Sequence, residues 1–336
     1  ADPTSAVVAG NTSVVHAGIV TANYLYGDGS NLSNVGFDPD ACQNLYAGTG
    51  AGSASGASTL FNVAIGFNAG KCLLGGDNNV FLGCYAGHYA TDCVDNVFLG
   101  SFAGRCNDGS NNIFLGINSG KGSATVCCNT AGHNIAIGDS AGCSLLTGCS
   151  NVFLGSYAGK GNSTGNWNVF IGHRASSNAT ISGSCNLSIG YYSGACLTSG
   201  TDNIFLGRYA GCSTSDLTHN IFIGLEAGKC SDSSRNIFLG PFAGKGSATF
   251  SNNTGADNIA IGCHSGCCLA TGCENIFLGR YAGRCADTAI QNIAIGNCSG
   301  RDATGLQNIF IGNNAGAIDS DGNYNGWNSS QQLGTQ

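Results

Sequence analysis

The stretch Asn203-Ile-Phe-Leu-Gly-Arg-Tyr-Ala-Gly211 recurs with small changes fifteen times along the 336-residue chain. Each copy begins with an asparagine, carries glycine four residues later and has Ala or Ser seven residues later. Successive copies are 16 to 18 residues apart, except for two spacings of 22 residues. A period near 17 residues is too short for the common helical repeats and fits one coil of a β-solenoid. The sequence therefore predicts an all-β fold, a parallel β-solenoid (β-roll or β-helix) of about fifteen coils.

The first asparagine of each copy is its anchor. Stacked coils would bring the anchors into one column, where each side-chain amide can satisfy its neighbour's donors and acceptors. The anchors expected to form this structural ladder are Asn62, Asn79, Asn96, Asn112, Asn134, Asn151, Asn168, Asn186, Asn203, Asn220, Asn236, Asn258, Asn275, Asn292 and Asn308.

Composition supports a turn-rich repeat fold. Charged residues make up 9% of the chain, against about 25% in an average soluble protein. The chain has 55 glycines and 3 prolines, which indicates many tight turns rather than helices. The net charge of −7 is modest, so we expect no nucleic-acid partner. No apolar run approaches the roughly 18–20 residues of a membrane helix, so we expect no membrane insertion.

The spacing of the anchors divides the chain into three parts. Residues 1–58 are expected to be a strand-rich attachment or assembly segment, and residues 317–336 a polar C-terminal tail. Residues 59–316 form the array, which consists of two seven-coil blocks plus one coil. Lys121-Gly-Ser-Ala-Thr and Lys245-Gly-Ser-Ala-Thr lie in the two 22-residue coils, and we expect both insertions to protrude as surface loops.

The strand of each coil is apolar on both faces. In the coil of Asn112, Ile113 and Leu115 share one face and Phe114 takes the other, a pattern typical of strands covered on both sides. Because an exposed phenylalanine column would favour aggregation, we expect another chain or a second wall to cover it. The candidate interface residues are Phe81, Phe98, Phe114, Phe153, Phe170, Phe205, Phe222, Phe238, Phe277 and Phe310.

Nineteen cysteines without paired CxxC spacing indicate disulfides and an oxidising exterior, with buried free thiols as the alternative. Stacked positions about 4.8 Å apart fall inside the Cα window of about 4.4–6.8 Å that a disulfide needs. The candidate disulfide cysteines are Cys84, Cys93, Cys143, Cys149, Cys196, Cys212, Cys230, Cys268, Cys273 and Cys285. The cysteines and His264 within residues 263–273 are the one metal-like cluster, but disulfides explain them equally well, so we expect no metal and no cofactor.

Two further columns follow the strand. Eight basic residues stand directly after the Ala-Gly or Ser-Gly pair: Lys71, Arg105, Lys121, Lys160, Lys229, Lys245, Arg284 and Arg301. Aromatic residues stand six residues after the anchor: Tyr85, Phe102, Tyr157, Tyr192, Tyr209, Phe242 and Tyr281. We expect a solvated corner and packing residues, with recognition of sulfated or acidic surface glycans as the alternative.

No motif predicts catalysis. The six histidines fall at scattered coil positions, and neither a Gly-x-Ser-x-Gly elbow nor a P-loop is present. Asp319-Ser-Asp-Gly-Asn323 lacks the twelfth-position Glu of a calcium loop, so we expect a plain turn. An ice-binding solenoid would need a regular outward Thr-x-Thr array, which no column supplies. We therefore expect that the protein is not an enzyme.

Two segments carry resemblances. Residues 18–33, Gly-Ile-Val-Thr-Ala-Asn-Tyr-Leu-Tyr-Gly-Asp-Gly-Ser-Asn-Leu-Ser, resemble a segment common in tail-fibre and virion-appendage proteins of marine bacteriophages. Asn-Ile-Ala-Ile-Gly-x-x-Ser-Gly, at residues 258–266 and 292–300, resembles the repeat of trimeric autotransporter adhesin heads. Those heads are left-handed parallel β-rolls, and related repeats occur in phage fibres. The resemblance covers the array at motif level and implies coiled β architecture and trimers.

These observations predict a structural subunit of an extracellular fibre or filament, either a phage appendage or a cell-surface filament. The expected partner is the chain itself, as a trimer or as a head-to-tail filament. The alternative function is an adhesin that binds cell-surface glycans along the rod. The expected location is extracellular or on the virion surface.

Overall fold

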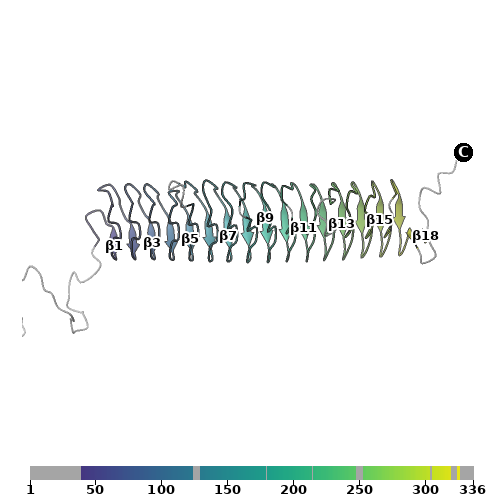
Figure 1. Cartoon of the computed structure of the whole chain (residues 1–336), viewed down its shortest axis with the longest axis horizontal. Coiled ribbons are helices and arrows are strands. Elements are labelled where there is room, and N and C mark those ends of the chain that lie inside the picture. Colours follow the sequence, from purple (N-terminus) through teal and green to yellow (C-terminus); the bar gives the residue numbers. More distant parts are fainter. Residues whose placement is uncertain are drawn as a thin grey trace, which may run out of the picture. The chain divides into compact units, whose positions relative to one another are not determined.

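The computed structural model describes residues 39–123, 129–178, 180–213, 215–246, 253–302, 305–318 and 324–325. Sixteen parallel strands form one sheet in which every strand pairs with its neighbours in sequence, from β1 to β16. The strands stand side by side and point the same way along the array, one to a coil (Figure 1). The predicted parallel β-solenoid is therefore confirmed.

Each of these strands is three residues long. Their bounds are β1 Leu45–Ala47, β2 Val63–Ile65, β3 Val80–Leu82, β4 Val97–Leu99, β5 Ile113–Leu115, β6 Ile135–Ile137, β7 Val152–Leu154, β8 Val169–Ile171, β9 Leu187–Ile189, β10 Ile204–Leu206, β11 Ile221–Ile223, β12 Ile237–Leu239, β13 Ile259–Ile261, β14 Ile276–Leu278, β15 Ile293–Ile295 and β16 Ile309–Ile311. A separate antiparallel pair, β17 Ala317–Ile318 and β18 Tyr324–Asn325, follows the array. No helix in the described ranges is long and apolar enough to cross a bilayer.

The solenoid begins one coil earlier than the sequence analysis predicted. β1 follows Asn44 and pairs in parallel with β2, with Leu45 opposite Val63. Residues 45–47 were expected to lie outside the array, so the boundary at residue 58 is corrected. Residues 1–38 of the expected attachment segment lie outside the described residues, as do residues 124–128 and 247–252 of the two expected loops.

The phenylalanine column faces the inside of the solenoid. Phe81, Phe98, Phe114, Phe153, Phe170, Phe205, Phe222, Phe238, Phe277 and Phe310 are all buried within the single chain. Neighbouring rings stack with centroids 4.9 Å apart for Phe98 and Phe114 and 5.0 Å apart for Phe222 and Phe238. The expected intersubunit interface at these residues is therefore wrong, because each coil folds back over its own strand and encloses the ring.

Four coils exchange volume between two interior positions. In these coils the middle residue of the strand is small, as at Ala260, and a leucine such as Leu269 stands eleven residues after the anchor and is buried. Where the middle residue is Phe277, the eleventh residue is Ala286. The same exchange pairs Ala64 with Leu73, Ala136 with Leu145 and Ser188 with Leu197. Interiors as dense as crystals tolerate such volume-conserving exchanges best.

The glycine that ends each strand is required by its backbone. Gly207 has a φ of +133°, and a Cβ there would lie 2.5 Å from the carbonyl oxygen of Gly224 in the next coil. Carbon and oxygen atoms cannot approach so closely without a shift of the backbone. The strand-ending glycines therefore allow the coils to stack at the spacing of a β-sheet.

Candidate interaction surfaces

The anchor asparagines form a continuous internal ladder. Asn203 donates its backbone N–H and its Nδ2 to the Oδ1 of Asn186, over 3.1 and 2.9 Å. Its own Oδ1 accepts the N–H and Nδ2 of Asn220, each at 3.1 Å. The backbone N–H of every anchor from Asn62 to Asn308 donates to the Oδ1 of the anchor before it. The ladder stabilises the stack and is not a surface.

The outward side of the sheet is apolar over its whole length. Its "aliphatic face" consists of the first and third residues of strands β1 to β16. All of these are Val, Ile or Leu except Ala47. They are half-buried or exposed in the single chain, as shown by Ile113 and Ile261, which are both 39% exposed. Contiguous apolar surface of this extent marks an interaction site. The aliphatic face therefore replaces the phenylalanine column as the candidate interface.

Two columns border the aliphatic face. The residue before each anchor and the residue after each strand-ending glycine flank the strand at its two ends. The "leading edge" consists of Gln43, Phe61, Asn78, Asp95, Asn111, His133, Ser150, Trp167, Cys185, Asp202, His219, Arg235, Asp257, Glu274, Gln291 and Gln307, which are all exposed. The "trailing edge" consists of Thr49, Phe67, Cys84, Ser101, Ile117, Asp139, Ser156, His173, Tyr191, Arg208, Leu225, Pro241, Cys263, Arg280, Asn297 and Asn313.

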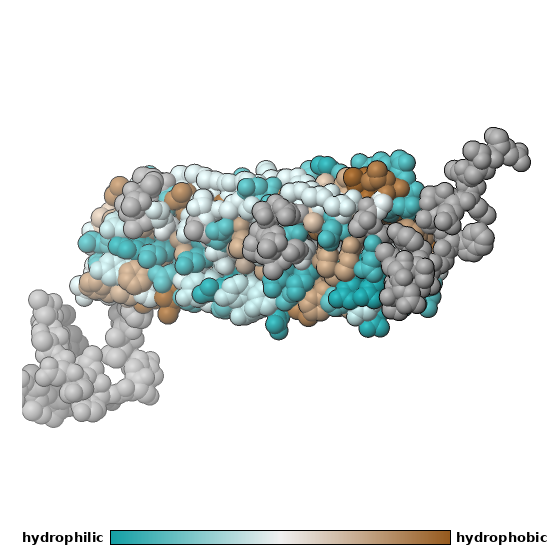
Figure 2. Space-filling model, turned by 45° about the vertical axis from the view of Figure 1, so that its right-hand side comes forward, coloured by the Kyte–Doolittle hydropathy of each residue, from teal (hydrophilic) through white to brown (hydrophobic). Residues whose placement is uncertain are grey.

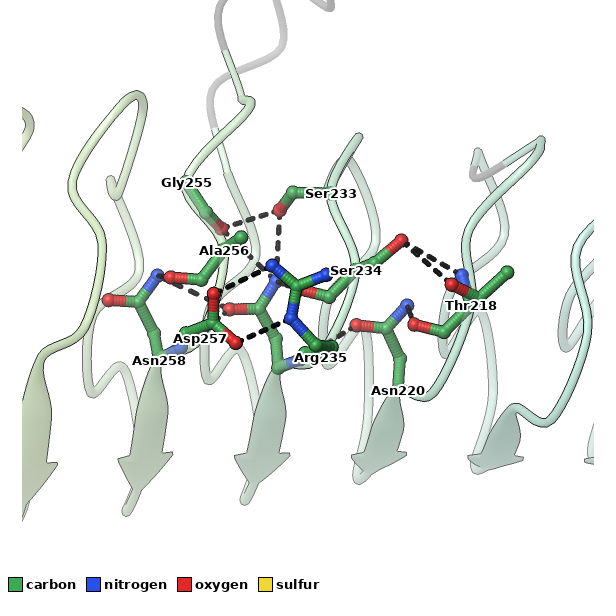
Figure 3. A network of polar contacts seen from close by, with 10 residues as sticks. Thr218, Asn220, Ser233, Ser234, Arg235, Gly255, Ala256, Asp257 and Asn258 are labelled. Carbon is green, nitrogen blue, oxygen red and sulfur yellow. Dashed lines mark hydrogen bonds and ion pairs between the residues drawn. The ribbon is translucent and has the colours of Figure 1, made fainter.

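One ion pair runs along the leading edge. Arg235 donates to Asp257 in the next coil through Nε at 2.6 Å and Nη2 at 2.8 Å (Figure 3). These hydrogen bonds lower the pKa of the Asp257 carboxyl and raise that of Arg235. Both side chains are exposed, so the pair adds little stability in water. The pair does neutralise the charges of Arg235 and Asp257 within one chain.

An aromatic and cationic corner follows the sheet. Tyr85 and Phe102, in adjacent coils, stack with ring centroids 5.4 Å apart, and the Arg105 guanidinium lies 5.6 Å from both centroids. Six of the eight predicted basic residues lie over a ring in this way: Arg105, Lys121, Lys160, Lys229, Lys245 and Arg284. The seven predicted aromatic side chains are half-buried, which indicates that they pack the corner as well as face water. Figure 2 shows one side of the array, where apolar patches alternate with polar surface.

One acid, Glu226, stands in the aromatic column, six residues after Asn220. Glu226 accepts from Lys245 at 2.8 Å and from Lys229 at 3.4 Å. The hydrogen bond from Lys245 lowers the pKa of the Glu226 carboxyl. The carboxylate therefore neutralises part of the charge of this section, whereas the corner around Arg105 keeps its positive charge.

The predicted disulfides are wrong for the described cysteines. Cys84, Cys93, Cys143, Cys149, Cys196, Cys212, Cys230, Cys268, Cys273 and Cys285 are all free thiols. Cys268 and Cys285 are free although both stand ten residues after their anchors. For three others, position in the coil gives a reason: Cys196 and Cys230 stand ten residues after their anchors, but Cys212 between them stands nine. Neighbouring residues on a chain point in different directions, so the three sulfurs do not form one column. Cys84 is exposed and Cys93 is buried, so these two side chains face different environments.

The thiols of Cys267 and Cys268 lie close together, with their sulfurs 3.5 Å apart. The hydrogen bond from Cys268 and the nearby Arg284 lower the pKa of Cys267 to about 7, whereas the pKa of Cys268 is raised. Burial raises the pKa of the Cys93 thiol to about 12. Within the described ranges no group of three or more His, Cys, Asp or Glu side chains could hold a metal ion. Residues 319–323, the expected plain turn, lie outside those ranges.

No protein-family model and no curated protein sequence matches the chain. The geometry of its surfaces is therefore the basis on which a function can be argued.

Proposed function

We propose that the chain is a structural subunit of an extracellular fibre or filament, in which copies of the chain cover one another's aliphatic faces. The observation that carries this proposal is the aliphatic face itself. It has two unbroken columns on sixteen strands, with no polar or charged residue in either column. An isolated chain would leave this surface in water at a cost that association removes.

The size of the face suits a stable interface. Sixteen strands at about 4.8 Å and three residues at about 3.3 Å give a strip of about 75 by 10 Å, or about 750 Å². A stable interface buries about 800 Å² on each partner. The face is also flat and regular, so that two sheets can pack about 10 Å apart along the whole array.

Two features support a fibre rather than a compact oligomer. A stack of sixteen coils extends in one direction, and its length is set by the number of repeats rather than by the size of a core. The repeat resembles those of trimeric autotransporter heads and of phage fibres, which favours three copies side by side. In a head-to-tail filament, the end strands β1 and β16 of successive subunits would meet instead. A location outside the cell or on a virion follows from the same resemblance.

Sedimentation equilibrium of the full chain tests the proposal. We expect a mass two or three times that of one chain. Replacing Ile137 and Ile261 by Lys places charges on the aliphatic face, and we expect this variant to be a monomer with an unchanged far-ultraviolet circular dichroism spectrum. The matched control is Leu74→Lys, an exposed leucine off the face, which should stay associated. A monomeric wild type, or a face variant that stays fully associated, would contradict the proposal.

The aromatic and cationic corner favours a second candidate, an adhesin that binds sulfated or acidic glycans along the rod. Half-exposed rings can stack on sugars while the cations over them bind sulfate or carboxylate groups. We expect the full chain to bind heparin and Arg105→Gln to weaken that binding. Arg235→Gln removes the same charge from the leading edge and should leave binding unchanged. Equal retention of both variants, or no retention of the wild type, would contradict this candidate.

A further inference from the structure

We infer that neighbouring copies of the chain associate parallel and in register, with the leading edge of each coil against the trailing edge of the same coil in the next copy. This inference rests on the proposed association through the aliphatic face. It adds the direction and the register of the copies, which the uniform aliphatic columns cannot define.

The charges of the two edges match within each coil. The trailing edge carries three charged residues, Asp139, Arg208 and Arg280. The leading-edge residues of the same three coils are His133, Asp202 and Glu274, respectively. The sign is reversed in the two coils with a trailing arginine, where Arg208 is matched with Asp202 and Arg280 with Glu274, and the trailing acid Asp139 is matched with a histidine rather than with another acid.

The two members of a match do not meet within one chain. They stand six residues apart, on either side of the three-residue strand, and no ion pair joins Asp202 to Arg208 or Glu274 to Arg280 among the described residues. On the leading edge, Asp202 lies 3.9 Å from His219, and Glu274 accepts from Gln291 at 2.8 Å. On the trailing edge, the Arg208 guanidinium lies 5.2 Å from the Tyr209 ring and that of Arg280 lies 4.7 Å from the Tyr281 ring. The matching therefore serves no contact in the isolated subunit.

In this arrangement, none of the other charged residues of the leading edge meets a trailing residue of like charge. Arg235 and Asp257 pair with each other along the edge, as described above, and the trailing residues of their coils, Pro241 and Cys263, are uncharged. The coil of Asp95 likewise has an uncharged trailing residue. No two like charges face each other when copies are in register.

Other arrangements lose the matches. A rotation axis along the solenoid brings the leading edge of one copy to the trailing edge of the next at the same height, whether two or three copies form the ring. Antiparallel copies would instead place leading edge against leading edge. Parallel copies shifted by one coil lose both in-register pairs and form at most one other attractive pair, that of Asp257 with Arg280. Such rim charges select direction and register rather than supply affinity.

Apolar residues follow the same pattern near the start of the array. Phe61 and Phe67, the leading and trailing residues of one coil, are 57% and 47% exposed. In register, Phe61 of one copy would contact Phe67 of the next copy, so that both rings leave water. A uniform polar rim would not need two large exposed rings in the same coil.

Charge exchange in the full chain tests the inference. One variant carries Asp202→Arg and Glu274→Arg, a second carries Arg208→Glu and Arg280→Glu, and a third carries all four changes. All four residues are exposed, so we expect no change in circular dichroism or in thermal unfolding at high dilution. The association constant should fall about tenfold or more in each of the first two variants, because like charges then face each other at two levels. It should return close to the wild-type value in the third variant. In a mixture of the first two variants it should return close to that value for a ring of two copies, and only in part for a ring of three, where one interface still joins two copies of the same variant.

The outcomes separate the two proposals. A wild type that stays monomeric overturns both the fibre and its register. An associated wild type whose four-site variant is not restored, or whose first two variants do not prefer each other in the mixture, overturns the parallel in-register arrangement alone. High salt should reduce all these differences, because the charges lie at a solvated rim.

Discussion

At the scale of single residues, the anchor asparagines donate and accept the hydrogen bonds that connect successive coils inside the solenoid. Asn203→Ala would remove an acceptor for two donors of Asn220 and a donor to the carbonyl oxygen of Leu217. Because buried groups left without partners are costly, we expect a loss of about 2–4 kcal/mol in unfolding free energy. Asn308 donates to the Oδ1 of Asn292 in the same way, but it precedes β16, the last strand of the sheet, so no later anchor uses its own Oδ1. Asn308→Ala should cost about 1 kcal/mol, as measured by urea denaturation. Equal losses at the two sites would contradict this account.

The strand-ending glycines allow the strain of the backbone to be separated from the contact between coils. Gly207 and Gly312 have similar φ angles, +133° and +127°. A Cβ at Gly207 would lie 2.5 Å from Gly224 O, whereas one at Gly312 would meet only the Ala315 Cβ at 3.9 Å. Gly312→Ala should cost about 1–3 kcal/mol through its φ alone. Gly207→Ala should cost at least about 1–3 kcal/mol more through overlap. Thermal unfolding of both variants provides the comparison.

The cysteine pair gives a pH-dependent prediction. The thiolate is the reactive form, and its fraction rises as the pH passes the pKa. Since the pKa of Cys267 is lowered to about 7, its alkylation by iodoacetamide should increase through neutral pH, below the range of an ordinary thiol. Cys93, whose pKa is raised to about 12, should stay unmodified until the chain unfolds. Residue-resolved mass spectrometry over a pH series measures both. A Cys267 profile with the midpoint of an unperturbed cysteine, near 8.5, would contradict the lowered pKa.

At the scale of the coil, the exchange of volume between two interior positions should appear as coupling. Ala260→Phe adds a ring beside Leu269 and should destabilise the chain by about 1–3 kcal/mol through overpacking. Leu269→Ala opens a cavity and should cost about 2–5 kcal/mol. The double variant reproduces the composition of the neighbouring coil, Phe277 with Ala286, and should cost clearly less than the sum. Additive losses in a double-mutant cycle would show that the two sites pack independently.

The strands could be predicted from sequence because each repeats the same residues at a nearly constant spacing. The first coil was missed because Leu45-Tyr-Ala47 differs from the usual strand residues, although Asn44, Gly48 and Ala51 keep the spacing of the pattern. Asn44 and Gly48 were a sufficient signal, since they alone provide the ladder and the close stacking.

The interior face could not be predicted from the strand alone. Both faces of Ile113-Phe-Leu115 are apolar, and an alternation of two apolar residues does not show which one turns inward. The exchange of Ala64 with Leu73 elsewhere in the array was the available signal, because only residues that share an enclosed space exchange volume. The edge charges were missed because their relation spans six residues and serves no contact within the chain.

At the scale of the whole molecule, the single chain satisfies its interior but not its outer face. The phenylalanines, the anchors and the glycines are all accounted for within one solenoid. The aliphatic face is left over, and its two edges carry matched residues that the chain itself does not bring together. The proposed association explains both features by a second copy of the chain at the same height.

Electron cryomicroscopy of the full chain tests this central claim most directly. The account predicts rods whose cross-section contains two or three parallel solenoids, with the residues of the aliphatic face, such as Ile113 and Ile261, enclosed between them. Rods made of one solenoid, with the aliphatic face open to solvent along its length, would contradict it.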